Sequence, residues 1–307
     1  MQEDQICYME QGSQNTNSFH LAGVIPVAGQ PLDFNLPWHD CMQPIAPNYL
    51  AIHHSIMECA WAGCETIWVV CHRDMQPLIR HEVGEYVQDP IWFNRSYERH
   101  PSEARKLIPI YYVPIHPKDR DRRDCLGWSV LYGANVAYWT SRKMSKWVIP
   151  DRYYASFPYG IYDNKILRNY RKEISSAKPF ALSHNDATVE EGLYLGFTFD
   201  GEDFKRYRNG LREKATGLRP PGTGKTNEKL PIEERWSARH FSLDNIFESV
   251  IIEETNKVDL PFYYSIDSWE GYCEFISSAE RPALQRPYEK ILKYNEFNPI
   301  GEDFEKE

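Results

Sequence analysis

Long apolar runs are missing from this sequence. A membrane-spanning helix needs roughly 18 consecutive apolar residues, and no run in the 307-residue chain approaches that length. The opening residues, MQEDQICYMEQGSQNTNS, also lack the basic and apolar regions of a secretory signal. We therefore expect a soluble, cytoplasmic protein with no membrane partner.

Positive charge and paired cysteines are scarce as well. The chain has 35 Lys and Arg residues against 44 Asp and Glu, which gives a net charge of −9 with histidine neutral. Because binding to a nucleic-acid backbone requires a basic face, we expect no nucleic-acid partner. The seven cysteines form no CxxC pair. They favour a reducing compartment over a disulfide framework.

Several familiar site motifs are absent or incomplete. Residues 219–226 read RPPGTGKT, but Arg219 stands where a P-loop has its first glycine, and no apolar strand precedes it. We interpret this segment as an exposed loop. No GxSxG or HExxH motif is present, so the sequence gives no support for a hydrolase. Zinc is not expected either, because the spacing does not give two close ligand pairs among His53, His54, Cys59, Cys64, Cys71 and His72.

Apolar segments that alternate with helical ones occupy most of the chain. Hydrophobic residues make up 42% of the sequence, which indicates a folded globular protein. We predict strands at 21–29, 66–71, 107–115, 146–151, 192–199 and 260–267, and helices at 49–62, after Asp74, and at 126–143, 163–174, 201–215, 241–251 and 268–280. This alternation predicts a mostly parallel central sheet flanked by helices.

The expected organisation is a single Rossmann-like α/β domain over residues 21–280. A polar N-terminal tail would precede it at 1–20, and a short C-terminal extension would follow at 281–307. Ligands of open parallel sheets bind at the carboxyl ends of the strands. The turn at Ala28 and Gly29, with the long loop 28–44, and the aspartates Asp151 and Asp267 are expected at such ends. Each aspartate could instead cap the helix that follows it.

Four segments resemble the sugar-nucleotide nucleotidyltransferases, the family of glucose-1-phosphate uridylyl- and thymidylyltransferases. In chain order they are VIPVAG, QPIAPNYLAIHHSIMECAWAGCETIWVVC, DCLGWSVLYGANVAYW and YYSIDSWEGYCEFI, spread over residues 21–277. The resemblance implies a nucleotidyltransferase fold of the GT-A type. It also implies transfer of a nucleotidyl group from a nucleoside triphosphate to a sugar phosphate, or to a similar phosphorylated small molecule, with release of pyrophosphate.

The resemblance also assigns roles to particular residues. Those expected near the nucleotide are Ala28, Gly29, Gln30, Gln43, Gly127 and Trp128. Asp151 and Asp267 resemble the two aspartates that hold Mg²⁺ between the phosphates, and Asp151 is accordingly a candidate catalytic residue. Carboxylate oxygens suit this hard cation.

The loop after the first strand departs from the family pattern. The family has GxGTR followed by Lys-Pro, whereas this chain reads GQPLDFNLPWHDCMQP and places Gln43 before Pro44. Losing a donor that stabilises the transition state costs on the order of 10²–10³ in rate. Lys118 and Arg120, in HPKDRDRRD, are candidate substitutes and therefore candidate catalytic residues. The other interpretation of that segment is a solvated, salt-bridged loop.

Whether the protein is an enzyme is left open by the sequence. The first hypothesis is a divergent Mg²⁺-dependent nucleotidyltransferase. The second is a protein that keeps the fold but has lost transfer chemistry and serves a binding or structural role. A GT-A glycosyltransferase is a third, although its metal motif finds a match only in DRD at 119–121. A homo-oligomer is compatible with the abundant aromatic residues.

Overall fold

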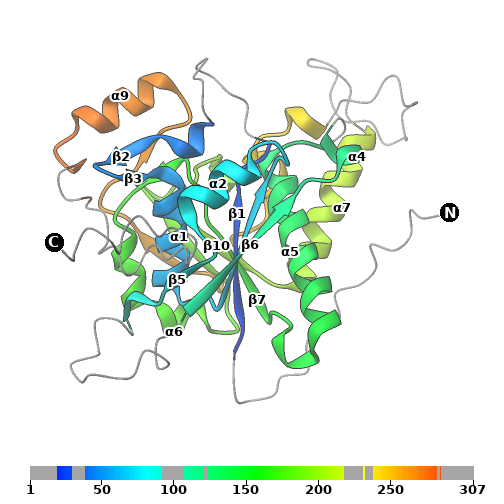
Figure 1. The fold of residues 1–307 in the computed structure, drawn as a ribbon. Helices are drawn as coiled ribbons and strands as arrows, with labels where there is room; N and C mark the ends of the chain where they lie inside the picture. The colour runs from blue at the N-terminus through cyan, green and yellow to red at the C-terminus, as the bar shows by residue number, and fades with distance from the viewer. Residues whose placement is uncertain are drawn as a thin grey trace, which may run out of the picture.

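A single eight-stranded sheet forms the central layer of the computed structural model (Figure 1). The structure describes residues 19–29, 39–91, 107–120, 123–217, 231, 238–281 and 284. Within them the strand order is β11-β9-β10-β7-β1-β4-β6-β5. The strands are β1 (Leu21–Pro26), β4 (Thr66–Cys71), β5 (Tyr86–Gln88), β6 (Leu107–Pro114), β7 (Arg152–Ala155), β9 (Phe180–Ser183), β10 (Phe197–Phe199) and β11 (Asn256–Asp259). β5 and β10 run antiparallel to their neighbours, and the other pairings are parallel.

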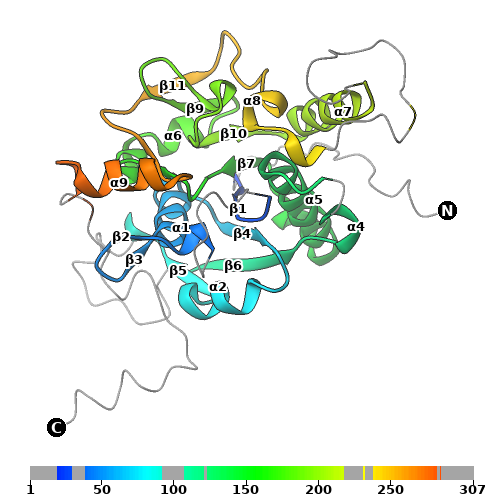
Figure 2. The ribbon, with the colours of Figure 1, turned by 90° about the horizontal axis from the view of Figure 1, so that it is seen from above.

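Helices cover both faces of this sheet, as the view from above shows (Figure 2). One face packs against α1 (Ala51–Ala62), α2 (Gln76–Val83), α6 (Arg171–Ile174) and α9 (Trp269–Ser277). The other packs against α5 (Leu126–Met144), α7 (Gly201–Gly217) and α8 (Leu243–Ile246). The expected α/β class with a mostly parallel sheet is therefore confirmed.

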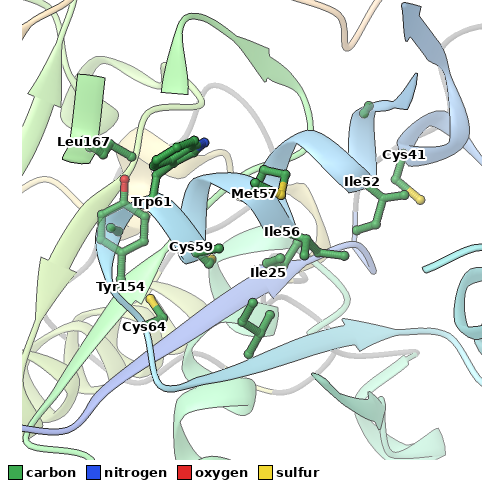
Figure 3. Close-up of a cluster of buried hydrophobic side chains, with 14 of the residues drawn as sticks. Ile25, Cys41, Ile52, Ile56, Met57, Cys59, Trp61, Cys64, Tyr154 and Leu167 are labelled. Carbon is green, nitrogen blue, oxygen red and sulfur yellow. The ribbon is translucent and has the colours of Figure 1, made fainter. Parts of the chain in front are cut away.

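The centre of the sheet is apolar because both of its faces are buried. Every residue of β1 is buried, and so are five of the six residues of β4. Central parallel strands therefore read as continuous apolar runs rather than as alternating ones. Ile25 of β1 lies against Ile56 of α1 in this core (Figure 3).

Helix α1 begins two residues later than the sequence suggested. Asn48 does not cap it but occupies a turn with φ 53° between β2 (Pro44–Ala46) and β3 (Tyr49–Leu50). The N-cap is Leu50, whose backbone N–H donates to the His53 ring at 3.2 Å. Gly63 ends the helix with φ 93°, a left-handed conformation that glycine adopts readily.

The strand expected at 146–151 is wrong. Residues Lys146–Val148 form the short 3-10 helix η3, and β7 begins only at Arg152. Pairing with β1 decides this boundary, because Leu21 is the first residue of β1 and its partner is Arg152. Val148 is 37% exposed, and Ile149 is only partly buried against the core.

Other expected elements are shorter than predicted, and some were missed. The segment 163–174 divides into η4 (Asn164–Asn169) and α6, while 192–199 and 241–251 reduce to β10 and α8. Of 260–267 only β12 (Tyr264–Ser265) is a strand, paired with β8 (Gly160–Ile161). β5, β9, β11 and the β2–β3 pair were not predicted. The remaining short elements are η1 (Asp40–Met42), α4 (Pro117–Arg120), η5 (Val189–Glu191) and η7 (Ala238–His240).

A buried carboxyl group ties α1 to the end of β7. Glu58 is fully buried and accepts hydrogen bonds from the Tyr154 hydroxyl and the Ser156 hydroxyl, each at 2.7 Å. Burial raises the pKa of Glu58 to about 7, although these hydrogen bonds act in the opposite direction. The folded protein therefore holds a proton at Glu58 over a pH range in which the unfolded chain has released it.

Replacing Glu58 with glutamine should remove a pH-dependent part of the stability. Between about pH 4.5 and pH 7 the folded state binds more protons than the unfolded state, so stability falls as pH rises through that window. Glutamine does not titrate, so we expect the free energy of unfolding of Glu58→Gln, measured relative to the parent, to be higher at pH 8 than at pH 5. The expected difference is on the order of 3 kcal/mol, because one pKa unit corresponds to about 1.4 kcal/mol. Denaturant unfolding at both pH values measures this difference.

The exposed Glu213 of α7 provides the control for this comparison. Glu213→Gln should change stability equally at pH 5 and pH 8. If Glu58→Gln behaves in the same way, the raised pKa of Glu58 is refuted.

Candidate functional site

The loop after β1 is fixed between β4 and α5 at the carboxyl edge of the sheet. The backbone N–H groups of Val27 and Ala28 both donate to the Val70 carbonyl, at 2.8 and 3.0 Å. On the other side, the Ser129 hydroxyl of α5 donates to the Ala28 carbonyl at 2.8 Å. The sequence expectation that Ala28 lies at this edge is therefore met by the structure.

Gly29 lies against the beginning of α5. Its φ is 90°, and a Cβ built on it would lie 2.3 Å from the backbone carbonyl carbon of Cys125. Both the backbone conformation and the lack of space therefore require glycine. Gln30, the next residue assigned to the nucleotide, is outside the described residues.

A histidine and an aspartate that the sequence analysis did not assign lie at the same edge. His72 follows β4, and its Nε2 lies 2.8 Å from a carboxylate oxygen of Asp124, which precedes α5. The second oxygen of Asp124 is buried and has no hydrogen-bond partner within the described residues. The side chains are 22% and 14% exposed, so the pair is accessible in part.

His39 lies close enough to this pair for their charges to interact. Burial, and then the positive charge of His72, lower the pKa of His39 to about 4. His39 is therefore neutral at neutral pH, and its Nδ1 accepts a hydrogen bond from the Cys41 backbone N–H at 3.3 Å.

Gly127 and Trp128 shape the first turn of α5. A Cβ at Gly127 would lie 2.4 Å from Ile246, so α8 packs directly on this glycine. Trp128 is 5% exposed, and its indole N–H has no hydrogen-bond partner within the described residues. The Arg123 guanidinium lies 4.9 Å from the Trp128 ring, within the range of a cation–π contact.

Gln43 has a structural position between η1 and α1. Its backbone N–H donates to the Asp40 carbonyl at 3.0 Å, and its own carbonyl accepts from Ala51 at 2.9 Å. The side chain is 1% exposed, and its amide nitrogen finds no hydrogen-bond partner in the described part of the chain.

The proposed substitute cations lie on the exposed helix α4. Both Lys118 and Arg120 are exposed. Arg120 forms an ion pair with Asp74 at 3.2 Å. Arg123 lies 4.0 Å from Asp119 across one turn. These pairings agree with the salt-bridged interpretation of the segment.

Asp151 and Asp267 lie at opposite ends of β7. Asp151 precedes the strand, and its carboxylate accepts from the His20 backbone N–H at 2.8 Å, beside the start of β1. Asp267 follows β12, where the Ile266 N–H donates to the Tyr159 carbonyl beyond the carboxyl end of β7. The four residues of β7 span about 13 Å at roughly 3.3 Å each.

A shared magnesium ion does not fit these two aspartates, because its ligands must lie within about 2.1 Å of the metal. Ser156 and Phe157 follow β7 at the end where an acid was expected. No cluster of three or more His, Cys, Asp or Glu side chains that could hold a metal occurs among the described residues.

Aromatic side chains occupy the space between Asp267 and the end of β1. Asp267 accepts from the Tyr194 hydroxyl at 3.0 Å. The Tyr194 ring lies 5.5 Å from the ring of Tyr159, whose hydroxyl donates to the Val27 carbonyl at 3.1 Å. Phe157 and Tyr159 are fully buried, so this part of the edge is filled by the chain itself.

Two of the similar solved structures are described as sugar-nucleotide enzymes. A protein from Bacillus anthracis assigned as a glucose-1-phosphate thymidylyltransferase, in complex with sucrose, is 10% identical, with a TM-score of 0.53 over 87% of this chain and 98% of that one. A UDP-glucose pyrophosphorylase complexed with UDP-glucose is 12% identical, with a TM-score of 0.47 over 84% and 97%. The first of these likenesses shows that the chain has a sugar-nucleotide nucleotidyltransferase-like fold, as the sequence resemblance implied.

Sequence comparison adds no family assignment. No protein-family model and no curated protein matches the chain. Within the part of the chain that the structure describes, none of the helices combines the length and the apolar character needed to cross a membrane. The loop with RPPGTGKT lies outside the described residues, apart from isolated flanking positions.

Substitution of Gly29 tests whether the close contact with α5 holds this edge together. Gly29→Ala should lower the free energy of unfolding by more than about 2 kcal/mol, because both strain and a backbone clash oppose the methyl group. Gly192 is a matched control, since its φ is 88° but a Cβ there would meet nothing within 4 Å. Gly192→Ala should cost only about 1 kcal/mol. Equal losses in denaturant unfolding would contradict the contact.

Proposed function

We propose that this protein binds a nucleotide or a nucleotide sugar at the carboxyl edge of β1 and β4, without the two-aspartate metal chemistry of nucleotidyl transfer. One observation carries the proposal: Asp151 and Asp267 lie at opposite ends of β7, so they cannot hold one metal ion together.

The chemistry of transfer argues in the same direction. A nucleotidyltransferase must stabilise the negative charge that develops at the α-phosphate, and cations placed at the site do so. The loop 28–44 contains no lysine and no arginine, and Arg120 is engaged by Asp74. The loop 28–44 and Arg120 therefore supply little of the required charge.

Binding has better support than transfer at the same edge. Ligands of open α/β sheets bind outside the carboxyl ends of the strands, where the order of connections changes direction. In this sheet β1 lies between β4 and β7, and the chain passes from β1 to β4 and β6 on one side before it returns to β7 on the other. The tight turn at Gly29 and the partly exposed His72 lie at that point.

Thermal melting against nucleotides tests the proposal. The panel contains ATP, GTP, CTP, UTP, dTTP and UDP-glucose, each with and without Mg²⁺. A ligand at a hundredfold its Kd adds about 2.7 kcal/mol to the free energy of unfolding, which is easily seen. We expect at least one nucleotide or nucleotide sugar to raise Tm. With UTP or dTTP and glucose 1-phosphate, we expect no pyrophosphate release above background.

Variants of the two aspartates provide the controls. Asp151→Asn should lower the stability of the free protein through its contact with His20, yet leave the ligand-induced shift unchanged. Pyrophosphate release that requires Mg²⁺ and is abolished by Asp267→Asn would instead establish a transferase. If no nucleotide and no nucleotide sugar shifts Tm, the binding function is refuted.

A further inference from the structure

We propose that His72, held by Asp124, is the residue that contacts the phosphate groups of the bound nucleotide. This inference rests on the proposed binding function and names the residue that would recognise the ligand's charge. It differs from the sequence expectation, which placed that task on Lys118 and Arg120.

His72 directly follows β4, and Val70 of the same strand accepts the hydrogen bonds that fix Val27 and Ala28. Asp124 precedes Cys125, whose backbone contacts Gly29. The pair of His72 and Asp124 therefore lies beside the turn at which a ligand of this fold class would be bound.

Two backbone N–H groups of this turn are already engaged within the protein. Phosphate loops normally present backbone N–H groups to the ligand. Here the N–H groups of Val27 and Ala28 already donate to Val70. These two N–H groups are therefore not available to a phosphate, so side-chain donors at this edge have to be considered.

Other polar side chains near the edge are less suited to that task. Arg120 is paired with Asp74, and Arg123 lies on the Trp128 ring and near Asp119. His39 is neutral at neutral pH and accepts a hydrogen bond from Cys41. His72 has one ring nitrogen engaged and remains 22% exposed.

The two ring nitrogens of His72 can serve different partners. Nε2 of His72 donates to the Asp124 carboxylate at 2.8 Å when it carries the proton, which fixes the orientation of the ring. Nδ1 then remains for the ligand, but in the neutral ring it is an acceptor, so it donates to a phosphate oxygen only when the ring is protonated. In an imidazolium both nitrogens donate, so the ring can bridge the Asp124 carboxylate and a phosphate oxygen.

A series of ligands that differ only in phosphate separates this role from a structural one. The probes are UTP, UDP, UMP and uridine, the equivalent adenine and thymine series, and glucose 1-phosphate. We expect His72→Ala to weaken triphosphate binding by about 10- to 100-fold, as for loss of a hydrogen bond to a charged group. Nucleoside affinity should change by less than about twofold, because the nucleoside lacks the group that His72 contacts.

Two further variants keep the test decisive if His72→Ala misfolds. His72→Gln keeps a polar side chain without a charge and should weaken triphosphate binding less than His72→Ala does. Asp124→Asn should weaken it by a few-fold, because the ring is no longer held by a carboxylate. His81, exposed on α2, gives the control His81→Ala, which should bind every probe as the parent does.

The outcomes are separable from those of the proposed function. If the parent binds triphosphates and the His72 variants bind them equally well, the role of His72 is overturned while the binding function stands. Equal weakening of triphosphate and nucleoside would show a structural role and also overturn it. Weakened binding of glucose 1-phosphate with unchanged triphosphate binding would place His72 at a sugar phosphate instead. If the parent binds neither nucleosides nor nucleotides, the proposed function itself fails.

Discussion

β1 is held between two helices at distances that leave no room for additional atoms, and the rest of the molecule depends on this packing. On one face, a Cβ at Gly23 would lie 2.8 Å from the sulfur of Cys59 in α1. On the other, a Cβ at Gly133 of α5 would lie 2.7 Å from Val24. Because protein interiors are close-packed, these contacts set the height of both helices above the sheet. They thereby determine where the start of α5 meets the loop after β1.

Burial shifts the pKa values of two ionisable groups in the interior. Burial raises the pKa of Glu58 to about 7 and lowers the pKa of His39 to about 4, so it favours the neutral form of each. Glu58 accepts hydrogen bonds from Tyr154 and Ser156, and His39 accepts one from Cys41. The partly exposed pair of His72 and Asp124 is different, because one carboxylate oxygen is left without a partner among the described residues. The pair can therefore still form a hydrogen bond to a polar ligand.

The sequence predicted the long, periodic elements well and the short ones poorly. The strand 66–71 and the helices 126–143 and 201–215 match β4, α5 and α7 closely, since many residues contribute to each pattern. β9 and β11 have four residues each, and only pairing with neighbours distinguishes them from loops. Asp151 was misplaced for a related reason. A strand predicted one segment too early puts its terminal acid at the opposite end of the sheet.

The rule that ligands bind at strand ends predicts the edge at which the proposed site lies, but on the proposed assignment the residue types expected there were too narrow. The family pattern predicts acids there because transfer requires a metal, whereas the spacing of His72 bears only on zinc binding. Holding a phosphate and transferring one make different demands. A bound phosphate needs hydrogen-bond donors in the ground state, whereas transfer needs charge placed where it develops in the transition state. On the proposed assignment, an oriented imidazolium meets the first demand without a metal. The separation of Asp151 from Asp267 removes a means of meeting the second.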